Sequence, residues 1–518
     1  MRIRRRFIVI PIVLIALAAA AALVAPMLAP AWPRRFGGGY PHFVHPDFRV
    51  VDRIDTASAR RARSLNGDTR VRAVARLVSD AHDSWLAATF GLRAIETTDP
   101  VLGLEEPALP QLGLAYLALH HVDPDGGYLE KAGRVRDLLL RGQLVSGGWS
   151  EMIVFTRKQR YARWRCGYIG TGAVFTPLHG MFKRRVVTDA TRFLMLLDAA
   201  RPDDRTRERA RLALRFILEA QLPGGGWPGF YRQNAPAQKP YNNLPTLNDG
   251  VIALCIEDLL LGYRLYGDAA YLEAAKQGGD FLRRTQVTDT VSDGQGAFRQ
   301  AGWGHHFEWR EGRTVLRRAR LYELPAVYTP GTCWAVLALM RLAAVTGDPA
   351  YLEPVPAALE WLRRSVLTVN FPGRWSCFYE EGTNRPFYCR REANGKRYLD
   401  RPGFDPADDP DWGRYLWVSR FRVDDARALW QQIERNGLEG LDTGLTRVDI
   451  RTDMPPERIE AMERAILARD DEALRRTESH AADVPRLMEY FADYLTRHAM
   501  ARRAASRPAG GARDLKDR

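Results

Sequence analysis

The sequence predicts an all-α fold: an α/α toroid of helix-pair repeats, an incomplete α/α barrel, behind an N-terminal membrane anchor or signal segment. Three observations support this prediction. Apolar residues recur at steps of three and four along most of the chain, no convincing alternating strand series interrupts them, and a tryptophan-containing turn recurs at near-constant spacing. The composition, 46% hydrophobic and 27% charged over 518 residues, is that of a folded chain.

The repeat is carried by turns that end in tryptophan. These tryptophans are separated by 78, 76 and 72 residues, at Trp149, Trp227, Trp303 and Trp375. Apolar periodicity predicts helices at 69–90, 112–121, 127–141, 189–200, 205–221, 249–266, 268–286, 331–346 and 349–366. Helix pairs with a fixed turn at one end predict an inner and an outer ring, with the turns on one face. Each tryptophan then either walls a cleft on that face or fills the gap between neighbouring repeats.

The first 31 residues (1–31) predict a signal-anchor or a signal peptide. Residues 7–25 carry no charge and follow four arginines, which suits a membrane span or a long signal-peptide core. Ala29-Pro30-Ala31 resembles a small-residue cleavage site. Both interpretations export the rest of the chain. It is expected to be anchored in the inner membrane and face the periplasm, or to be periplasmic or secreted after cleavage.

Four further segments are expected along the chain. Residues 32–66 are rich in Pro, Gly, His and Arg and predict a linker, and residues 67–418 are expected to form the toroid. Residues 419–505 predict accessory helices, and residues 506–518, with Pro, Gly and mixed charge, predict a disordered tail. The accessory helices are expected at 424–436, 457–469 and 484–502.

The formal net charge of +14 comes mainly from the two ends of the chain. Six arginines lie in the first 35 residues, and residues 502–518 hold six basic side chains against two acidic ones. Little excess charge is left for the body, so the basic composition does not predict nucleic-acid binding. The five cysteines are scattered, and their spacing fits neither a disulfide framework nor a zinc site. The oligomeric state stays open.

Aspartates near two predicted helix starts are candidate site residues. Asn248-Asp249-Gly250 opens one helix, and Asp189 stands at the start of an earlier one. Asp249 either caps its own helix or binds a ligand. Two aspartates at equivalent helix starts on one face could share a hard cation, because calcium takes carboxylate oxygens without strict geometry.

Cations and aromatics are dense between Gly302 and Pro325. This stretch contains His305 and His306, which are expected to line a cleft or hydrogen-bond locally, because no third metal ligand accompanies them. It also contains four arginines, among them Arg320. Arg385 comes from the next repeat, and each of these two arginines either lines the site or forms a surface ion pair.

Several motifs occur in a fixed order along the chain. GGWPGFY…YNNLPTLNDG is followed by GWGHHFEW…RARLYELPA, then by LMRLAAVTGDPAYL, then by RWSCFYEEGTNRPFYCRREANGKRYLD. This ordered set resembles the pectate lyases of polysaccharide lyase family 10 over roughly residues 149–417. The resemblance implies an α/α toroid, in agreement with the repeat. It also implies a calcium-dependent lyase that cleaves polygalacturonate or a related acidic uronan by β-elimination, and therefore an acidic polysaccharide as partner.

The resemblance assigns roles to individual residues. Asp189 and Asp249 match aspartates that help to bind calcium, Arg320 matches the Brønsted base, and Arg385 matches an arginine of the substrate cleft. Further substrate contacts are expected from Trp227, Lys239, Asn248, Trp303 and Tyr322, with Lys183 as another candidate.

An arginine base requires an explanation, since its ordinary pKa of about 12.5 to 13.8 keeps it protonated. Neighbouring positive charges disfavour the protonated form, and Arg313, Arg317 and Arg318 surround Arg320 in the sequence. We therefore expect an alkaline activity optimum.

The sequence departs from the family pattern at two places. Gly250 stands where the family has the second aspartate of N-D-D, and Asp189 directly abuts Ala190, which shortens the usual spacer. One alternative is therefore a catalytically lapsed, membrane-anchored toroid that binds or processes an acidic exopolysaccharide. Another is a terpene cyclase-like toroid, because QLVSGGW and QLPGGGW satisfy Q-x-x-x-G-x-W, although no D-x-D-D run is present. A third is a glycoside hydrolase with paired carboxylates.

Overall fold

The computed structural model describes residues 49–90, 101–103, 109–150, 152–154, 180–231, 240–319, 323–368, 371–391, 398–401, 418–439, 441–448, 450, 452, 454–477 and 484–505. The predicted signal-anchor at 1–31, the first part of the predicted linker (residues 32–48) and the predicted tail at 506–518 lie outside these residues.

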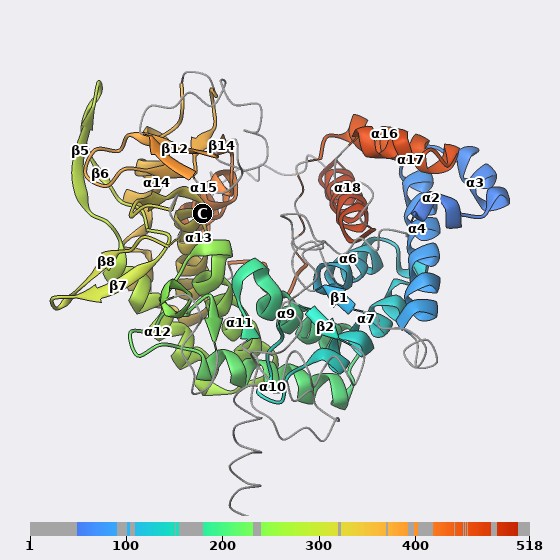
Figure 1. The fold of residues 1–518 in the computed structure, drawn as a ribbon, viewed down its shortest axis with the longest axis horizontal. Helices are drawn as coiled ribbons and strands as arrows, with labels where there is room; N and C mark the ends of the chain where they lie inside the picture. Colours follow the sequence, from blue (N-terminus) through green and yellow to red (C-terminus); the bar gives the residue numbers. More distant parts are fainter. Residues whose placement is uncertain are drawn as a thin grey trace, which may run out of the picture.

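The long helices form two concentric layers (Figure 1). The inner layer holds α6 (Leu109–Val122), α9 (Val186–Ala200), α11 (Val251–Tyr266) and α13 (Thr329–Thr346). The outer layer holds α4 (Gly67–Phe90), α7 (Tyr128–Gly142), α10 (Asp204–Glu219), α12 (Ala269–Thr285) and α14 (Val355–Arg364). Inner helices are apolar on nearly all faces and buried, whereas outer helices are amphipathic and expose one polar face. The predicted α/α toroid is confirmed.

Helices from both ends of the sequence extend the ring. At the C-terminal end, α18 (Val484–Ala505) packs against α6 and α4, and α15 (Val423–Asn436) packs against α13. At the N-terminal end, α2 (Val50–Arg53) and α3 (Thr56–Arg63) pack against α16 (Pro456–Ala468), which adjoins α17 (Asp471–Thr477) (Figure 1).

These helices correct two predicted boundaries. Part of the predicted linker is helical, because Val50, Val51, Ala59 and Ala62 give its two short helices buried apolar faces. The helices predicted to be accessory share one hydrophobic core with the toroid, so residue 419 does not begin a separate unit.

The four repeated tryptophans make one hydrogen bond in common. Each indole Nε1 donates to a backbone carbonyl in the last turn or turn and a half of the preceding outer helix. The acceptors are Leu139 for Trp149 (2.9 Å), Ile217 for Trp227 (2.8 Å), Leu282 for Trp303 (2.8 Å) and Leu362 for Trp375 (2.6 Å). Carbonyls at a helix C-terminus lack intrahelical partners, so each tryptophan satisfies one while filling the gap between repeats.

A repeated glutamine links successive outer helices. Nε2 of Gln221 donates to the carbonyl of Gly225 in its own turn (2.9 Å) and to Ala274 on α12 (2.9 Å). Gln143 repeats this pattern with Gly147 and with Arg209 on α10. The Q-x-x-x-G-x-W pattern is therefore an inter-repeat clamp, and its presence gives no support to a terpene cyclase.

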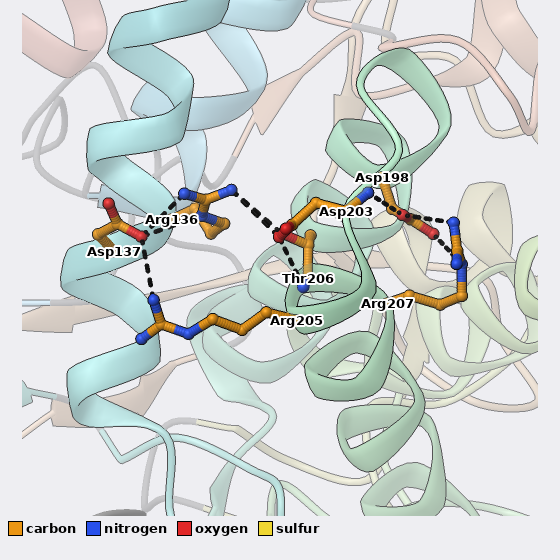
Figure 2. A network of polar contacts seen from close by, with 7 residues as sticks. All are labelled: Arg136, Asp137, Asp198, Asp203, Arg205, Thr206 and Arg207. Carbon is orange, nitrogen blue, oxygen red and sulfur yellow. Dashed lines mark hydrogen bonds and ion pairs between the residues drawn. The ribbon is translucent and has the colours of Figure 1, made fainter.

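Ion pairs also join neighbouring helices within the outer layer and between the two layers (Figure 2). Arg136 on α7 contacts Asp203, whose Oδ2 accepts the backbone N–H of Thr206 at 2.9 Å and so caps α10. Asp198 at the end of α9 pairs with Arg207 on α10 at 3.2 Å. These contacts fix the α9–α10 hairpin against α7.

Short strands lie in the connections between helices. The antiparallel pairs are β1 (Val101–Gly103) with β2 (Met152–Val154), β3 (Gly180–Met181) with β4 (Phe230–Tyr231), β5 (Asp289–Asp293) with β6 (Gly296–Gln300), β7 (Phe307–Arg310) with β8 (Arg313–Leu316), and β10 (Trp375–Ser376) with β14 (Val418–Ser419). A four-stranded sheet has the order β13 (Tyr398–Arg401), β12 (Pro386–Arg391), β11 (Phe378–Tyr379), β9 (Val327–Tyr328). These strands were not predicted from the sequence, because most are too short to show alternation.

One described helix, Thr329–Thr346, is long and apolar enough to cross a membrane by composition, but 72% of it is buried in the protein. This is α13, and its burial identifies it as a core helix of the inner layer.

Candidate functional site

The residues that lead into α9 and α11 share one conformation. A 3-10 turn, η3 (Lys183–Arg185), precedes α9, and η5 (Asn248–Gly250) precedes α11. The last two residues of each turn are left-handed, with φ of 51° and 61° before α9 and of 53° and 75° before α11. Asp249 is therefore the counterpart of Arg184. The prediction that Asp189 and Asp249 occupy equivalent helix starts is wrong, because Asp189 lies inside the first turn of α9.

Asp249 joins the two turns. Its Oδ2 accepts hydrogen bonds from the backbone N–H of Arg184 (2.8 Å) and from Nδ2 of Asn248 (3.2 Å). It does not cap α11, because the residue at the cap position is Gly250. The carboxylate thus stabilises two left-handed turns 65 residues apart, which places Arg184 and Asn248 together at the entrance to the inner helices.

Asp189 is buried, with 1% of its surface exposed. Nε2 of Gln111 on α6 donates to Oδ2 at 2.5 Å, and Nη2 of Arg185 lies 3.0 Å from Oδ1. The guanidinium of Arg185 therefore balances the negative charge of Asp189. The hydrogen bond from Gln111 fastens α6 to the start of α9.

Trp334 fills the space next to Gly250. A Cβ built on Gly250 would meet Cδ2 and Cε2 of the Trp334 ring at 3.0 Å, and the φ of 75° is unfavourable for a residue with a side chain. An indole from α13 is therefore packed against the position at which the family resemblance implies a second aspartate.

The strand-like segment from Trp303 to Phe307 is the hub of the candidate site. On one side, Oγ1 of Thr246 donates to the carbonyl of His305 at 2.7 Å, next to the Asn248 turn. On the other side, the backbone N–H of Arg317 donates to the carbonyl of His306 at 2.9 Å. The backbone N–H of Tyr328 on β9 donates to the carbonyl of Trp303 at 2.7 Å. The hub therefore aligns the segment that carries Asp249, the segment that carries Arg317, and the β9–β11 sheet.

A row of polar and aromatic side chains crosses this hub. Nζ of Lys183 lies 4.7 Å from the ring centroid of Tyr241, whose ring meets His306 edge-on at 5.8 Å. Nδ1 of His306 and Nδ1 of His305 are 2.6 Å apart, so one ring donates and the other accepts. Nε2 of His305 lies 4.0 Å from Oε1 of Glu323. The expectation that the histidines hydrogen-bond locally is confirmed.

Of the remaining predicted site residues, two are buried and three lie outside the described part of the chain. Trp227 and Trp303 are fully buried, so the packing alternative holds and they are unavailable to a substrate. Arg320, Tyr322 and Lys239 lie outside the described residues. On either side of the first two, the backbone N–H of Ala319 donates to the carbonyl of Glu323 at 3.2 Å.

Arg385 forms the ion pair that the sequence left open. Nη2 of Arg385 lies 2.8 Å from Oε2 of Glu380, and its side chain is 64% exposed. Hydrogen bonds from Thr383 and then from Arg385 hold the pKa of Glu380 below its usual range. Its neighbour Asn384 is left-handed and accepts the indole N–H of Trp361 at 2.7 Å, which anchors the turn.

The described carboxylates do not fit a calcium site. Both oxygens of Asp189 and Oδ2 of Asp249 already accept hydrogen bonds or ion pairs, and Trp334 occupies the place of a further carboxylate. Within the described residues there is no group of three or more His, Cys, Asp or Glu side chains able to hold a metal ion. The surrounding charge, from Lys183, Arg184 and Arg185, is better suited to an anion.

Sequence reasoning missed several of these contacts. Tyr241, Gln111 and Trp334 were not predicted, because each meets the site from a distant part of the chain. The run Lys183-Arg184-Arg185, placed directly before a periodic helix, was the one local signal that could have revealed the cationic turn.

Comparison with known proteins supports one family. Residues 143–371 match the model of the pectic acid lyase family. No curated protein sequence matches the chain.

Solved structures with a similar course of the chain are distant in sequence. A mutant of a family 10 polysaccharide lyase from Cellvibrio cellulosa, in complex with trigalacturonic acid, has a TM-score of 0.43 and 16% identity, and covers 63% of this chain and 98% of its own. A sugar epimerase from a ruminal bacterium has a TM-score of 0.40 and 11% identity, and covers 75% of this chain and 88% of its own. A GH76 α-mannanase from Bacteroides thetaiotaomicron has a TM-score of 0.40 and 10% identity, and covers 76% of this chain and 87% of its own.

Proposed function

We propose that this protein, a pectate lyase-like lyase whose residues 143–371 match the pectic acid lyase family, cleaves a pectate-like acidic uronan by β-elimination. The observation that carries the proposal is that the matched segment contains the cationic turn Lys183–Arg185, the Asp249 contact and the hub around His305 and His306. Positive side chains and hydrogen-bond donors at one entrance to the inner helices suit a polymer that bears a carboxylate on every sugar.

The chemistry requires a base and a cationic environment. A base takes the proton from C5, a double bond forms between C4 and C5, and the C4–O bond breaks with its electrons leaving on the glycosidic oxygen, which then takes a proton. Charge develops on the uronate carboxylate, and fixed cations such as Lys183 and the neighbouring arginines stabilise it. We propose Arg320 as the base, as the resemblance implies, with Asn248 and Arg385 as substrate contacts.

Calcium enters this proposal as a requirement to be tested. The resemblance implies the ion, but the described carboxylates are already engaged, so no step of the reaction is assigned to it.

The test is an absorbance assay on the full chain. Polygalacturonate is incubated at alkaline pH with calcium or with a chelator, and the unsaturated product is followed by its ultraviolet absorbance. We expect activity in the wild type, loss in Arg320→Ala, and no change in Arg310→Ala, an exposed arginine on β7 of the same stretch. No absorbance under any condition would overturn the assignment.

The second candidate is a toroid that binds an acidic polysaccharide without cleaving it. The observation that favours it is the loss of a carboxylate at Gly250, whose place Trp334 occupies. Retention of polygalacturonate by the protein together with no unsaturated product would favour this candidate over the lyase.

We further propose that residues 1–31 export the protein, either as an inner-membrane anchor or as a cleaved signal. Fractionation with a tag at the C-terminus tests this, since a cytoplasmic tag would contradict both forms of the proposal.

A further inference from the structure

Three exposed arginines lie in the last turn of the short helix α3: Arg60, Arg61 and Arg63. The opposite side of the helix is formed by Ala59 and Ala62, which are buried and let the helix lie close against the protein. The preceding acidic residue, Asp55, accepts the backbone N–H of Ser58 at 2.7 Å and caps the other end of α3. These three residues, the α3 arginines, therefore form a basic face.

The α3 arginines form no ion pair with a carboxylate among the residues that the structure describes. Arg61 donates to Oγ of Ser58 at 2.9 Å, and Arg63 donates to the backbone carbonyl of Leu467 on α16. Both acceptors are uncharged, so neither contact cancels a positive charge. Because all three side chains are exposed, a negatively charged surface can reach them.

The nearby helix α17 differs in this respect. Nε of Arg475 lies 2.9 Å from Oδ2 of Asp471, and Nη1 of Arg476 lies 3.0 Å from Oε1 of Glu472. Each of these arginines is therefore neutralised within its own helix. Residues 49–63, by contrast, hold five arginines against two aspartates and carry a net charge of +3.

Contacts with α16 fix the orientation of the basic face. Arg469, at the end of α16, donates to the backbone carbonyls of Val51 (3.1 Å) and Asp52 (3.2 Å). Its Nη1 also donates to Oγ1 of Thr56 at the start of α3 (3.2 Å). The helix packs against α4 as well, and Figure 1 shows it at the outer edge of the ring. The α3 arginines are therefore held on a fixed element before any partner binds, which lowers the entropy cost of binding.

The basic face follows closely on the predicted membrane span. Residues 26–48 join the uncharged stretch at 7–25 to Arg49, and these 23 residues can extend over at most about 80 Å. They contain two further arginines, Arg34 and Arg35. A span at 7–25 therefore keeps α3 within reach of the bilayer surface and raises its local concentration there.

We propose that the α3 arginines dock the protein onto the surface of a bilayer that contains anionic phospholipids. A guanidinium group donates paired hydrogen bonds to a phosphate, and basic side chains near an anionic bilayer are attracted to it. The docked helix holds the ring in one orientation on the membrane that residues 7–25 span. This inference rests on the proposed anchor and is independent of the lyase reaction.

An acidic polysaccharide offers the same sign of charge, but the position of α3 favours the membrane. The helix packs against α4 and α16, which carry no residue of the candidate site. The α3 arginines are therefore separate from the cationic turn Lys183–Arg185, whereas they follow the predicted span directly in the order of the chain.

Hydrogen–deuterium exchange of the full chain in lipid nanodiscs tests the docking. The discs contain phosphatidylcholine alone, or phosphatidylcholine with about 30% phosphatidylglycerol, and the readout is the exchange of residues 56–66. We expect exchange there to slow at least about threefold in the anionic discs, and we expect high salt to abolish the difference.

The double variant Arg60→Gln/Arg61→Gln should remove this difference. Arg63 is kept because its bond to Leu467 contributes to the packing of α3. Arg211→Gln/Arg215→Gln is the matched control, since both arginines are exposed on α10 in another part of the ring (Figure 1). Unchanged exchange in phosphatidylcholine discs and an unchanged thermal melt confirm that both double variants are folded.

Equal exchange in the two kinds of disc, or the same slowing in Arg60→Gln/Arg61→Gln as in the wild type, would overturn the proposal. Slowing by polygalacturonate but not by phosphatidylglycerol would also overturn it, because the face would then serve the polymer.

Failure of the anchor is detected separately, by washing the membranes with alkaline carbonate. A protein that is washed out contradicts the anchor alone. Docking is then measured by co-sedimentation of the full chain with vesicles of the same two compositions. There Arg60→Gln/Arg61→Gln should bind the anionic vesicles about tenfold more weakly than the wild type, and equal binding would overturn the docking.

Discussion

The Trp334 ring lies against the backbone of Gly250, so closely that a Cβ at this glycine would meet two ring carbons at 3.0 Å. Since Gly250 follows Asp249 directly, the fit of the indole decides what the turn before α11 can carry. A second carboxylate is excluded there by packing.

Gly250→Ala should therefore destabilise the fold more than an equivalent change elsewhere. Gly267, at the other end of α11, is the control, because its φ of 72° is nearly the same but nothing lies within 4 Å of its Cβ position. We expect Gly267→Ala to cost about 1 to 2 kcal/mol from backbone strain alone, and Gly250→Ala to cost clearly more. Urea unfolding measures both; equal costs would show that the indole moves aside.

Gln221→Ala tests the clamp between outer helices. Nε2 of Gln221 serves two buried or half-buried carbonyls, and its removal leaves both without that donor. We expect a loss of about 1 to 3 kcal/mol in the free energy of unfolding. Gln295→Ala, in an exposed hairpin, should change it by less than about 0.5 kcal/mol. A loss in Gln221→Ala no larger than in the control would argue against the clamp.

Arg341→Met tests the buried charges of the inner layer. Arg341 and Glu257 are both nearly inaccessible to solvent, so removal of the guanidinium leaves a carboxylate partly uncompensated. We expect a cost of about 3 to 5 kcal/mol. Arg283→Met breaks an exposed pair with Glu353 and should cost less than about 1 kcal/mol. Denaturant midpoints compare the two, and similar values would contradict the assigned burial effect.

Asp258 should make stability fall as pH rises. Burial raises its folded-state pKa from 3.8 to about 8, with Arg192 opposing the shift. Between these values the unfolded chain loses the proton while the folded protein keeps it, so unfolding is increasingly favoured as pH rises from about 4 to about 8. Above about pH 8 this contribution levels off. Asp258→Asn should flatten the decline, as measured by urea unfolding at pH 5, 6, 7 and 8; an unchanged slope would assign the decline to other groups.

Lys183→Met should lower lyase activity without unfolding the protein. Lys183 supplies positive charge beside Arg184 and the Asp249 turn, and Met keeps most of the aliphatic volume. We expect kcat/KM on polygalacturonate to fall at least tenfold, which corresponds to about 1.4 kcal/mol of transition-state stabilisation. Lys276→Met on the outer helix α12 is the control and should leave kcat/KM unchanged. Equal values for the two variants would remove Lys183 from the site.

The sequence allowed the ring of helices to be predicted because each helix is encoded locally. The period of the apolar residues places α11 and α13, for example, to within a few residues. The tryptophan spacing revealed the repeat but not the role of each indole, since cleft lining and gap filling require the same residue. The hairpin β7–β8 was missed because four-residue strands show too little alternation.

The candidate site was predicted only in part because its geometry depends on contacts distant in sequence. Asp249 and Asp189 look alike in the sequence, but only the left-handed turns show that Asp249 corresponds to Arg184. Likewise, the local sequence around Gly250 does not reveal that Trp334 would fill its space. Such relationships follow from how inner helices meet.

The packing of α18 against α6 and α4 also constrains the order in which the ring can form. During synthesis α6 (residues 109–122) emerges well before its partner α18 (residues 484–505). Over that interval α6 presents apolar surface with no permanent neighbour on that side, so the nascent chain is exposed to aggregation and to chaperones. Docking of α18 onto α6 and α4 is therefore expected to follow the folding of the helices between them.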